Sequence, residues 1–237
     1  MNTDYYENTD KNFEEALKLN STEFSNEELK QMLCFGNIVQ KQIAALNYSN
    51  VKTEEDAKIL LDNLTGCDGK IREAVAFQIN KILIEKPQTH ILFAKLSAET
   101  FADATIDING NICRLVTDSA AILKTYEDFS KQYTQKIIKF AKIALQELDK
   151  FIFRDKKYVI NKQIFKLYWC LETLKNFYKY AESDDFNYVI EKSFQQKEYT
   201  IREKVAEIIT DLEGFENIKI QLQNDKNYYV RQAILNH

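Results

Sequence analysis

Apolar residues recur at helical spacing along most of the chain, in segments separated by short polar turns. Five segments begin alike, with a polar turn, a β-branched residue, and then further apolar residues at offsets such as four, eight and eleven. This spacing places each apolar set on one face of an α-helix. The leading residues of the five copies are Ile71, Ile112, Ile160, Ile201 and Val230.

Other amphipathic segments lie between these copies. They span residues 89–103, 130–150, 186–194 and 215–222. Alternation typical of strands is nowhere sustained, and 237 residues with 5 Gly and 1 Pro are poor in turn formers. We therefore predict an all-α protein of about a dozen helices, two per repeat.

The front of the chain is less regular. Residues 26–46 and 54–64 form a comparable helical pair, and Thr53 followed by three acidic residues predicts the start of the second helix. Residues 1–24 are polar and sparse in apolar periodicity, which predicts an N-terminal tail, with helix in part of it as an open alternative. Residues 25–237 are predicted to form a single repeat domain.

Three of the five copies carry a sequence signature that resembles the HEAT-repeat family. The matching stretches are residues 68–75, 199–206 and 225–233. The resemblance covers about residues 50–237 and implies a right-handed α-solenoid, an α-α superhelix of about five helix pairs. It also implies a ladder between repeats, made of an Asp in the turn and an Arg after the leading residue: Asp68, Arg72, Arg202, Asp225 and Arg231. The second and third copies depart from it, with Cys113 and Asn161 where Arg is expected.

The physics of such an arrangement does not depend on the family name. A single helix pair cannot bury its apolar face, so successive pairs stack and share one continuous core. In such stacks the second helices of the pairs line an extended concave surface. We expect function to reside on that surface.

Charge is distributed unevenly along the chain. The formal net charge is -4 and the isoelectric point is near 5.5, which argues against non-specific nucleic-acid binding. Residues 131–180, however, hold 12 basic and 4 acidic residues, a net +8, whereas their neighbours are acidic. This basic block keeps a nucleic-acid partner open.

The single tryptophan lies within the basic block. A rotation of about 100° per residue puts Ile160 and Ile164 on the core side of their helix, and Lys162, Lys166, Trp169, Thr173 and Asn176 opposite. One interpretation is an aromatic platform in a basic groove, where Trp169 stacks on a base and the lysines meet phosphates. The other is that Trp169 packs against the adjacent repeat and the lysines are solvated.

The same geometry applied to other copies gives no continuous basic track. In the second copy Arg114 and Asp118 lie opposite Ile112, four residues apart, where they could bind a partner or form an ordinary i, i+4 pair. In the fourth copy Glu203 and Glu207 take these positions and would repel a phosphate backbone.

One HEAT-like family, the DNA-alkylation-repair glycosylases, is enzymatic. It uses aromatic residues and a carboxylate on a basic concave face, and Trp169 with Glu172 or Asp118 invites the comparison. The chain departs from that family in having 1 Trp, an acidic balance, and Thr173 where the catalytic Asp is expected.

Other chemistry finds no support in the sequence. The four cysteines are far apart, and the only histidines are His90 and His237, so no metal site can be written. Nucleotide-binding, hydrolase and metalloprotease motifs are absent. We expect no cofactor and no metal, and leave enzymatic activity open while favouring its absence. With no apolar run long enough for a membrane span and no secretory signal, we expect no membrane association and a cytoplasmic location.

These observations favour a non-enzymatic scaffold that binds a macromolecular partner, above all a protein, on its concave face. The alternative is a nucleic-acid-binding or base-excising solenoid that uses Trp169 and the neighbouring lysines. The hypothetical binding residues are Trp169, Lys162, Lys166, Arg114 and Asp118. The sequence does not identify the partner or the oligomeric state.

Overall fold

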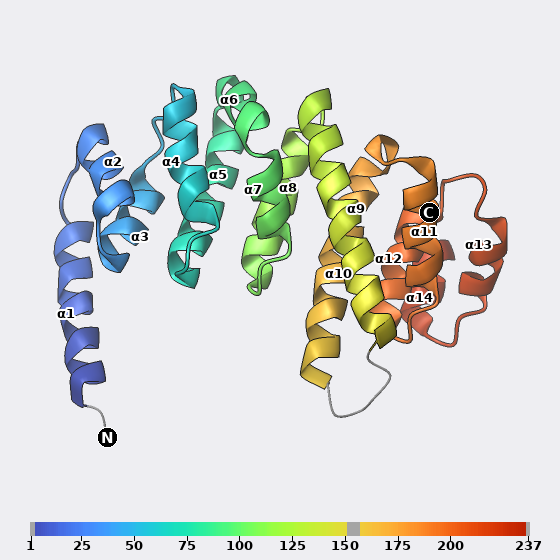
Figure 1. Ribbon diagram of the computed structural model, residues 1–237. Helices are drawn as coiled ribbons and strands as arrows, with labels where there is room; N and C mark the ends of the chain where they lie inside the picture. Colours follow the sequence, from blue (N-terminus) through green and yellow to red (C-terminus); the bar gives the residue numbers. More distant parts are fainter. Residues whose placement is uncertain (1–2, 151–156, 236–237) are drawn as a thin grey trace. The chain divides into compact units, whose positions relative to one another are not determined.

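The computed structural model describes residues 3–150 and 157–235, and within them it contains fourteen α-helices, two short 3₁₀ helices and no strand (Figure 1). The predicted all-α class is confirmed. In chain order the helices are α1 (Thr3–Asn20), α2 (Asn26–Phe35), α3 (Ile38–Asn47), α4 (Glu54–Leu64), α5 (Gly69–Glu85), η1 (Pro87–Thr89), α6 (His90–Leu96), α7 (Ala98–Thr105), α8 (Gly110–Ile122), α9 (Glu127–Lys150), α10 (Lys157–Phe177), η3 (Tyr178–Tyr180), α11 (Ser183–Phe194), α12 (Tyr199–Ile209), α13 (Glu216–Gln223) and α14 (Tyr228–Leu235).

The five predicted copies coincide with five of these helices. Their leading residues fall in α5, α8, α10, α12 and α14, and the preceding segments form the first helices of the pairs. Helix α4 packs on α5, α9 on α10, α11 on α12, and α13 on α14. The helix pair is therefore the structural unit, as the apolar periodicity predicted.

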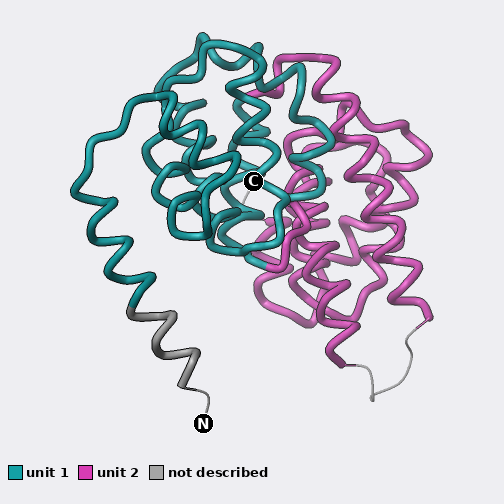
Figure 2. Tube along the Cα trace, turned by 60° about the vertical axis from the view of Figure 1, so that its left-hand side comes forward, with its two compact units in different colours: residues 1–104, 109–122 teal, residues 105–108, 123–237 magenta. Residues whose placement is uncertain are grey.

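The helices form two compact units (Figure 2). In the first unit, which holds residues up to 104 together with 109–122, α5 packs between α3 and α8, and α4 packs against α2 and α6. In the second unit, which holds residues 105–108 and those from 123 onward, α12 packs between α10 and α14, and α9 packs against α11. Each unit thus has a layer of first helices and a layer of second helices. Because residues 25–237 are divided between the units, a single repeat domain stays a prediction.

Apolar and aromatic side chains fill the space between the two layers. In the second unit Phe129, Tyr133 and Phe177 are almost fully buried and meet ring to ring, with centroids 5.2 to 6.4 Å apart. The Tyr133 hydroxyl is satisfied there by Thr105 Oγ1 at 2.7 Å. Buried aromatic pairs of this geometry add stability beyond the area they bury.

The N-terminal region contains one more helix break than predicted. Residues 26–46 were expected as one segment, but the chain ends α2 at Phe35 and starts α3 at Ile38. Asn37 caps α3, because its side chain accepts from the Gln40 N–H while Gln40 bonds back to the Asn37 N–H. At Gly36 a Cβ would lie 2.5 Å from the Met32 carbonyl oxygen, so the sharp turn requires glycine.

Capping at Thr53 agrees with the prediction. Its side chain accepts from the Asp56 N–H at 3.2 Å, and Asp56 accepts from the Thr53 N–H at 2.9 Å. The segment expected as an N-terminal tail contains α1. The Glu15 carboxylate of α1 accepts a hydrogen bond from Asn37 Nδ2 at 3.0 Å, which connects α1 to the start of α3.

Helix α10 differs most from the predicted register. Its buried stripe runs from Leu167 through Leu171 and Leu174 to Phe177, whereas Ile160 and Ile164 are only half-buried. Thr173, expected on the exposed side, is fully buried and donates its hydroxyl to the Trp169 carbonyl at 2.9 Å. The reason is the length of the helices: α10 has 21 residues and α12 only 11, so the first turns of α10 have no turns of α12 beside them.

Candidate binding surface

Trp169 lies in the second unit on α10, in a cluster of aromatic rings. Its ring meets Phe165 and Tyr168 edge to face, with centroids 6.3 and 5.4 Å apart. The side chain is half-buried, and its Nε1 is shielded from solvent without an acceptor among the described residues. Trp169 is thus neither a fully exposed platform nor a core residue; part of its ring borders the surface.

The two lysines predicted beside Trp169 are one and two turns earlier on α10. Lys162 is exposed and Lys166 half-buried. Within residues 3–150 and 157–235, neither lysine forms an ion pair with a carboxylate at 4.0 Å or less. These two side chains give the start of α10 a positive surface.

Farther along α10 the charges are balanced. Lys204 of α12 lies 2.7 Å from the Glu172 carboxylate and 2.9 Å from that of Glu207, and Lys175 also reaches Glu207 at 2.9 Å. The Lys204 ammonium also sits 5.2 Å from the centroid of the Tyr168 ring. We call the residues Trp169, Glu172, Lys175, Lys204 and Glu207 the α10–α12 surface.

The pKa values of this network reflect its pairing. Burial alone would lower the pKa of Lys204, but hydrogen bonds to Glu172 and Glu207 outweigh it and raise the pKa. Burial likewise would raise the pKa of Glu207, but Lys175 and Lys204 outweigh it and lower the pKa. Lys204 and Glu207 are therefore charged near neutral pH, and both lysines of the network lie within 2.9 Å of a carboxylate oxygen.

Ion pairs also occupy much of the basic block. Four of its lysines contact carboxylates: Lys131 with Glu127 at 2.6 Å, Lys142 with Asp185 at 2.7 Å, Lys150 with Glu147 at 2.7 Å, and Lys175 with Glu207 at 2.9 Å. A net charge of +8 counted along the chain therefore overstates the positive potential that a polyanion would meet.

Arg114 and Asp118 lie on α8 in the first unit, whereas Trp169 belongs to the second. Their closest atoms, Arg114 Nη1 and Asp118 Oδ2, are 3.7 Å apart, and both side chains are more than half exposed. An exposed pair of this kind contributes little to stability. The structure gives it no further partner among the described residues.

The arginines expected in a ladder share one local contact. Each donates from Nη1 to carbonyls five or six residues earlier, in the turn before its helix: Arg72 to Gly66 and Cys67, Arg202 to Gln196 and Lys197, and Arg231 to Asp225. These bonds satisfy carbonyls at the end of each preceding segment. Arg202 also pairs with the acidic residue of the following copy, Asp225. Asp68 caps its own helix by accepting from the Lys70 and Ile71 N–H groups.

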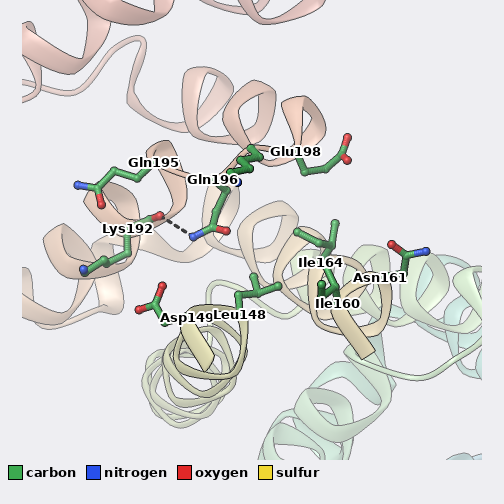
Figure 3. Close-up of a pocket in the computed structure, with 10 residues that line it drawn as sticks. Leu148, Asp149, Ile160, Asn161, Ile164, Lys192, Gln195, Gln196 and Glu198 are labelled. Atoms are coloured by element: carbon green, nitrogen blue, oxygen red, sulfur yellow. Dashed lines mark hydrogen bonds between the residues drawn. The ribbon is translucent and has the colours of Figure 1, made fainter. Parts of the chain in front are cut away.

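The half-buried start of α10 borders a cleft of about 540 Å³ (Figure 3). Leu148, Ile160 and Ile164 form its apolar part. Its polar side chains come from α9 and α10 (Asp149 and Asn161) and from the end of α11 and the segment after it, which supply Lys192 and Gln195 among others. Ile160 and Ile164 were predicted in the core. They line this cleft because the first turns of α10 extend beyond the start of α12.

Sequence reasoning missed the exposed tyrosines on α12 and α14. Tyr199, Tyr228 and Tyr229 lie at the starts of these helices, and the rings of Tyr199 and Tyr229 stack 6.2 Å apart. The sequence contains a pattern that could have indicated them, because Tyr199 and Tyr228 each precede the leading residue of their copy by two positions.

Two kinds of site are not seen in the described part of the chain. No group of three or more His, Cys, Asp or Glu side chains could hold a metal ion among those residues. No described helix is both long and apolar enough to cross a membrane.

A solved structure with a similar arrangement of helices is that of an archaeal HEAT-like repeat protein from Thermococcus onnurineus NA1. It is 12% identical in sequence, the match covers 91% of this chain and 79% of that one, and the TM-score is 0.49. No protein-family model and no curated protein matches the sequence. The all-α repeat fold follows from the helix pairs themselves.

Proposed function

We propose that the protein is a non-catalytic helical-repeat scaffold that binds a protein partner through the second helices of its second unit. The supporting observation is the position of Lys204 between the Glu172 and Glu207 carboxylates, beside the Trp169 aromatic cluster. Protein interfaces are enriched in aromatic anchors, and charged residues are depleted from their cores. A phosphate backbone requires unpaired cations instead.

The free thiols support a reducing compartment as the place of action. Cys34 and Cys67 are exposed and Cys113 and Cys170 buried, and none of the four belongs to a disulfide in the described part of the chain. Exposed thiols are better preserved in the cytoplasm than in an oxidising compartment. A cytoplasmic location is part of the proposal.

Selection of binding peptides tests the proposal. Random 12-residue peptides displayed on phage would be selected on the wild-type protein, and their affinities would then be compared with those for a Trp169→Ala/Lys204→Met variant whose helicity is verified by circular dichroism. We expect peptides whose affinity falls at least about tenfold in that variant, because aromatic anchors carry most interface energy. Peptides that bind both proteins equally would contradict the proposed surface.

A DNA-binding assay tests the alternative that the protein binds nucleic acid. Lys162 and Lys166 are the cations near Trp169 that could meet phosphates, so labelled 20-base-pair duplex and 20-nucleotide single-stranded DNA would be titrated at about 50 mM salt. We expect no saturable binding. Tight binding that weakens steeply with salt, and that Lys162→Glu/Lys166→Glu abolishes, would replace the proposal with the nucleic-acid alternative.

A further inference from the structure

Three exposed tyrosines form a small aromatic surface at the starts of α12 and α14. Tyr199 and Tyr229 stack with their ring planes 27° apart, and Tyr228 meets Tyr229 edge to face at 5.6 Å. Their exposed fractions are 37%, 58% and 58% for Tyr199, Tyr228 and Tyr229. Each ring therefore keeps part of its surface accessible to a partner.

A carboxylate without an ion-pair partner among the described residues lies one turn after Tyr199 on α12. Glu203 follows Tyr199 by four residues on α12, and side chains at this spacing are neighbours on a helix. It is half-buried and forms no hydrogen bond or ion pair with the described residues. Burial and the nearby Glu207 carboxylate raise the pKa of Glu203, and the positive charge of Lys204 offsets only part of this rise.

The contrast with Glu207, one turn farther along the same helix, is informative. Glu207 is bound by both Lys175 and Lys204, whereas Lys204 directs its ammonium to Glu172 and Glu207. The cations of the α10–α12 surface are thus engaged on the side of α12 that faces α10. Neither ammonium group forms an ion pair with Glu203, which lies one turn after Tyr199 on the same helix.

We propose that Tyr199, Tyr229 and Glu203 bind a cationic side chain, arginine or lysine, of the protein partner. Exposed aromatic faces attract such cations, and a carboxylate adds a charge-assisted hydrogen bond. Partial burial of Glu203 weakens the competition from water for that bond. This inference rests on the proposed protein-binding function and specifies the chemistry of the partner.

Short peptides test this site directly. Acetylated and amidated Gly-Gly-X-Gly-Gly pentapeptides, with X as arginine, lysine or the neutral isostere citrulline, would be titrated into protein with ¹³C-labelled tyrosine rings. The Tyr199→Phe and Tyr229→Phe variants assign the two ring signals. We expect saturable shifts of both signals with a cationic peptide, and at least about fivefold weaker binding of the citrulline peptide.

Two carboxylate variants provide the matched comparison. Glu203→Gln should reduce the affinity for the cationic peptides about fivefold, to the level of the citrulline peptide. Glu191→Gln, an exposed carboxylate on α11, should leave the affinity unchanged. The ratio of arginine to lysine affinity tells which cation the site favours.

The inference is overturned if citrulline binds as well as arginine and lysine, or if Glu203→Gln leaves their affinities unchanged. Its failure is distinguishable from failure of the proposed function. Phage-selected peptides that need Trp169 and Lys204 but ignore Glu203→Gln would remove only this inference. Selected peptides that ignore all three residues would remove the proposed function as well.

Discussion

Arg202 on α12 and Asp225 in the turn before α14 form a two-point ion pair, with Nε 2.7 Å from Oδ2 and Nη2 3.1 Å from Oδ1. Both side chains are about nine-tenths buried, at 9% and 10% exposure. Arg202 also donates to the carbonyls of Gln196 and Lys197, and Asp225 accepts from the Asn227 N–H. One pair of side chains thus connects the last two helix pairs and orders the turns that precede both second helices.

Removing the charge of Asp225 should therefore be costly. In Asp225→Asn the buried Arg202 guanidinium loses its counter-charge, and we expect the free energy of unfolding to fall by about 2–4 kcal/mol. Urea unfolding followed by circular dichroism measures it. Asp211→Asn, at an exposed position after α12, serves as the control and should change stability by less than about 0.5 kcal/mol. Equal effects of the two substitutions would contradict the role of the pair.

Titration of Asp56 should make the free energy of unfolding depend on pH in the acidic range. Burial alone would raise its pKa, but Lys30, Tyr48 and the N–H groups of Lys52 and Thr53 all bond to its carboxylate and lower the pKa. A pKa lower in the folded state stabilises the fold above the unfolded value near 4, and this contribution is lost as the pH falls.

The measurement is urea unfolding at pH 7, 5 and 3. Asp56→Asn should be less stable at pH 7, and between pH 5 and pH 3 it should lose roughly 1 kcal/mol less than the wild type. Asp62→Asn, an exposed neighbour on α4, should keep the wild-type pH dependence. A wild-type slope in Asp56→Asn would exclude Asp56 as the titrating group.

Burial should determine how much each of two ion pairs with equal N–O distances contributes to the stability of the fold. Lys204–Glu207 and Lys95–Glu54 both have closest N–O distances of 2.9 Å, but the first pair is 12% and 17% exposed and the second 56% and 51%. Double-mutant cycles with Lys→Met and Glu→Gln should give a coupling energy of about 1–2 kcal/mol for the first and at most about 0.5 kcal/mol for the second. Similar coupling energies for the two pairs would contradict the expectation that solvent screening weakens the exposed pair.

Gly36 and Gly66 give a matched test of the α2–α3 turn. A Cβ at Gly36 would lie 2.5 Å from the Met32 carbonyl oxygen and 2.8 Å from Gln40 Cβ, whereas at Gly66 the nearest atom is 3.6 Å away. Gly36→Ala should therefore reduce the free energy of unfolding by about 1–3 kcal/mol. Gly66→Ala should change it by less than about 1 kcal/mol. Thermal or urea unfolding of both variants measures these changes. Equal stability of the two variants would contradict the close approach at Gly36.

Quenching of Trp169, the single tryptophan, should report its surroundings. Lys162 and Lys166 precede it on α10, while Lys204 and Glu172 neutralise each other nearby. Because the two lysines attract anions, we expect iodide to quench the native emission more strongly than caesium at low salt. The Lys162→Glu/Lys166→Glu variant should lower the ratio of the iodide to the caesium quenching constant roughly twofold. No quenching by either ion would mean that Trp169 is closed to the surface and would weaken its role in binding.

Local periodicity was enough to place most of the helices and their buried faces. Ile71, Ile112, Ile201 and Val230 were expected to lead buried stripes, and all are 8% exposed or less. A helix fixes the direction of each side chain about its own axis, and that geometry can be counted from the sequence. The same holds for Thr53, because an N-cap bonds to residues only a few positions away.

Tertiary structure decided everything that depends on a neighbouring helix. Ile160 follows the same pattern as the other leading residues, but it borders a cleft because α12 is too short to cover the start of α10. Glu207 was expected to repel phosphate, and it instead binds Lys175, 32 residues earlier in the chain. Helical periodicity specifies which way a side chain points from its own axis, whereas burial and charge pairing are set by the length and side chains of the helix that packs beside it.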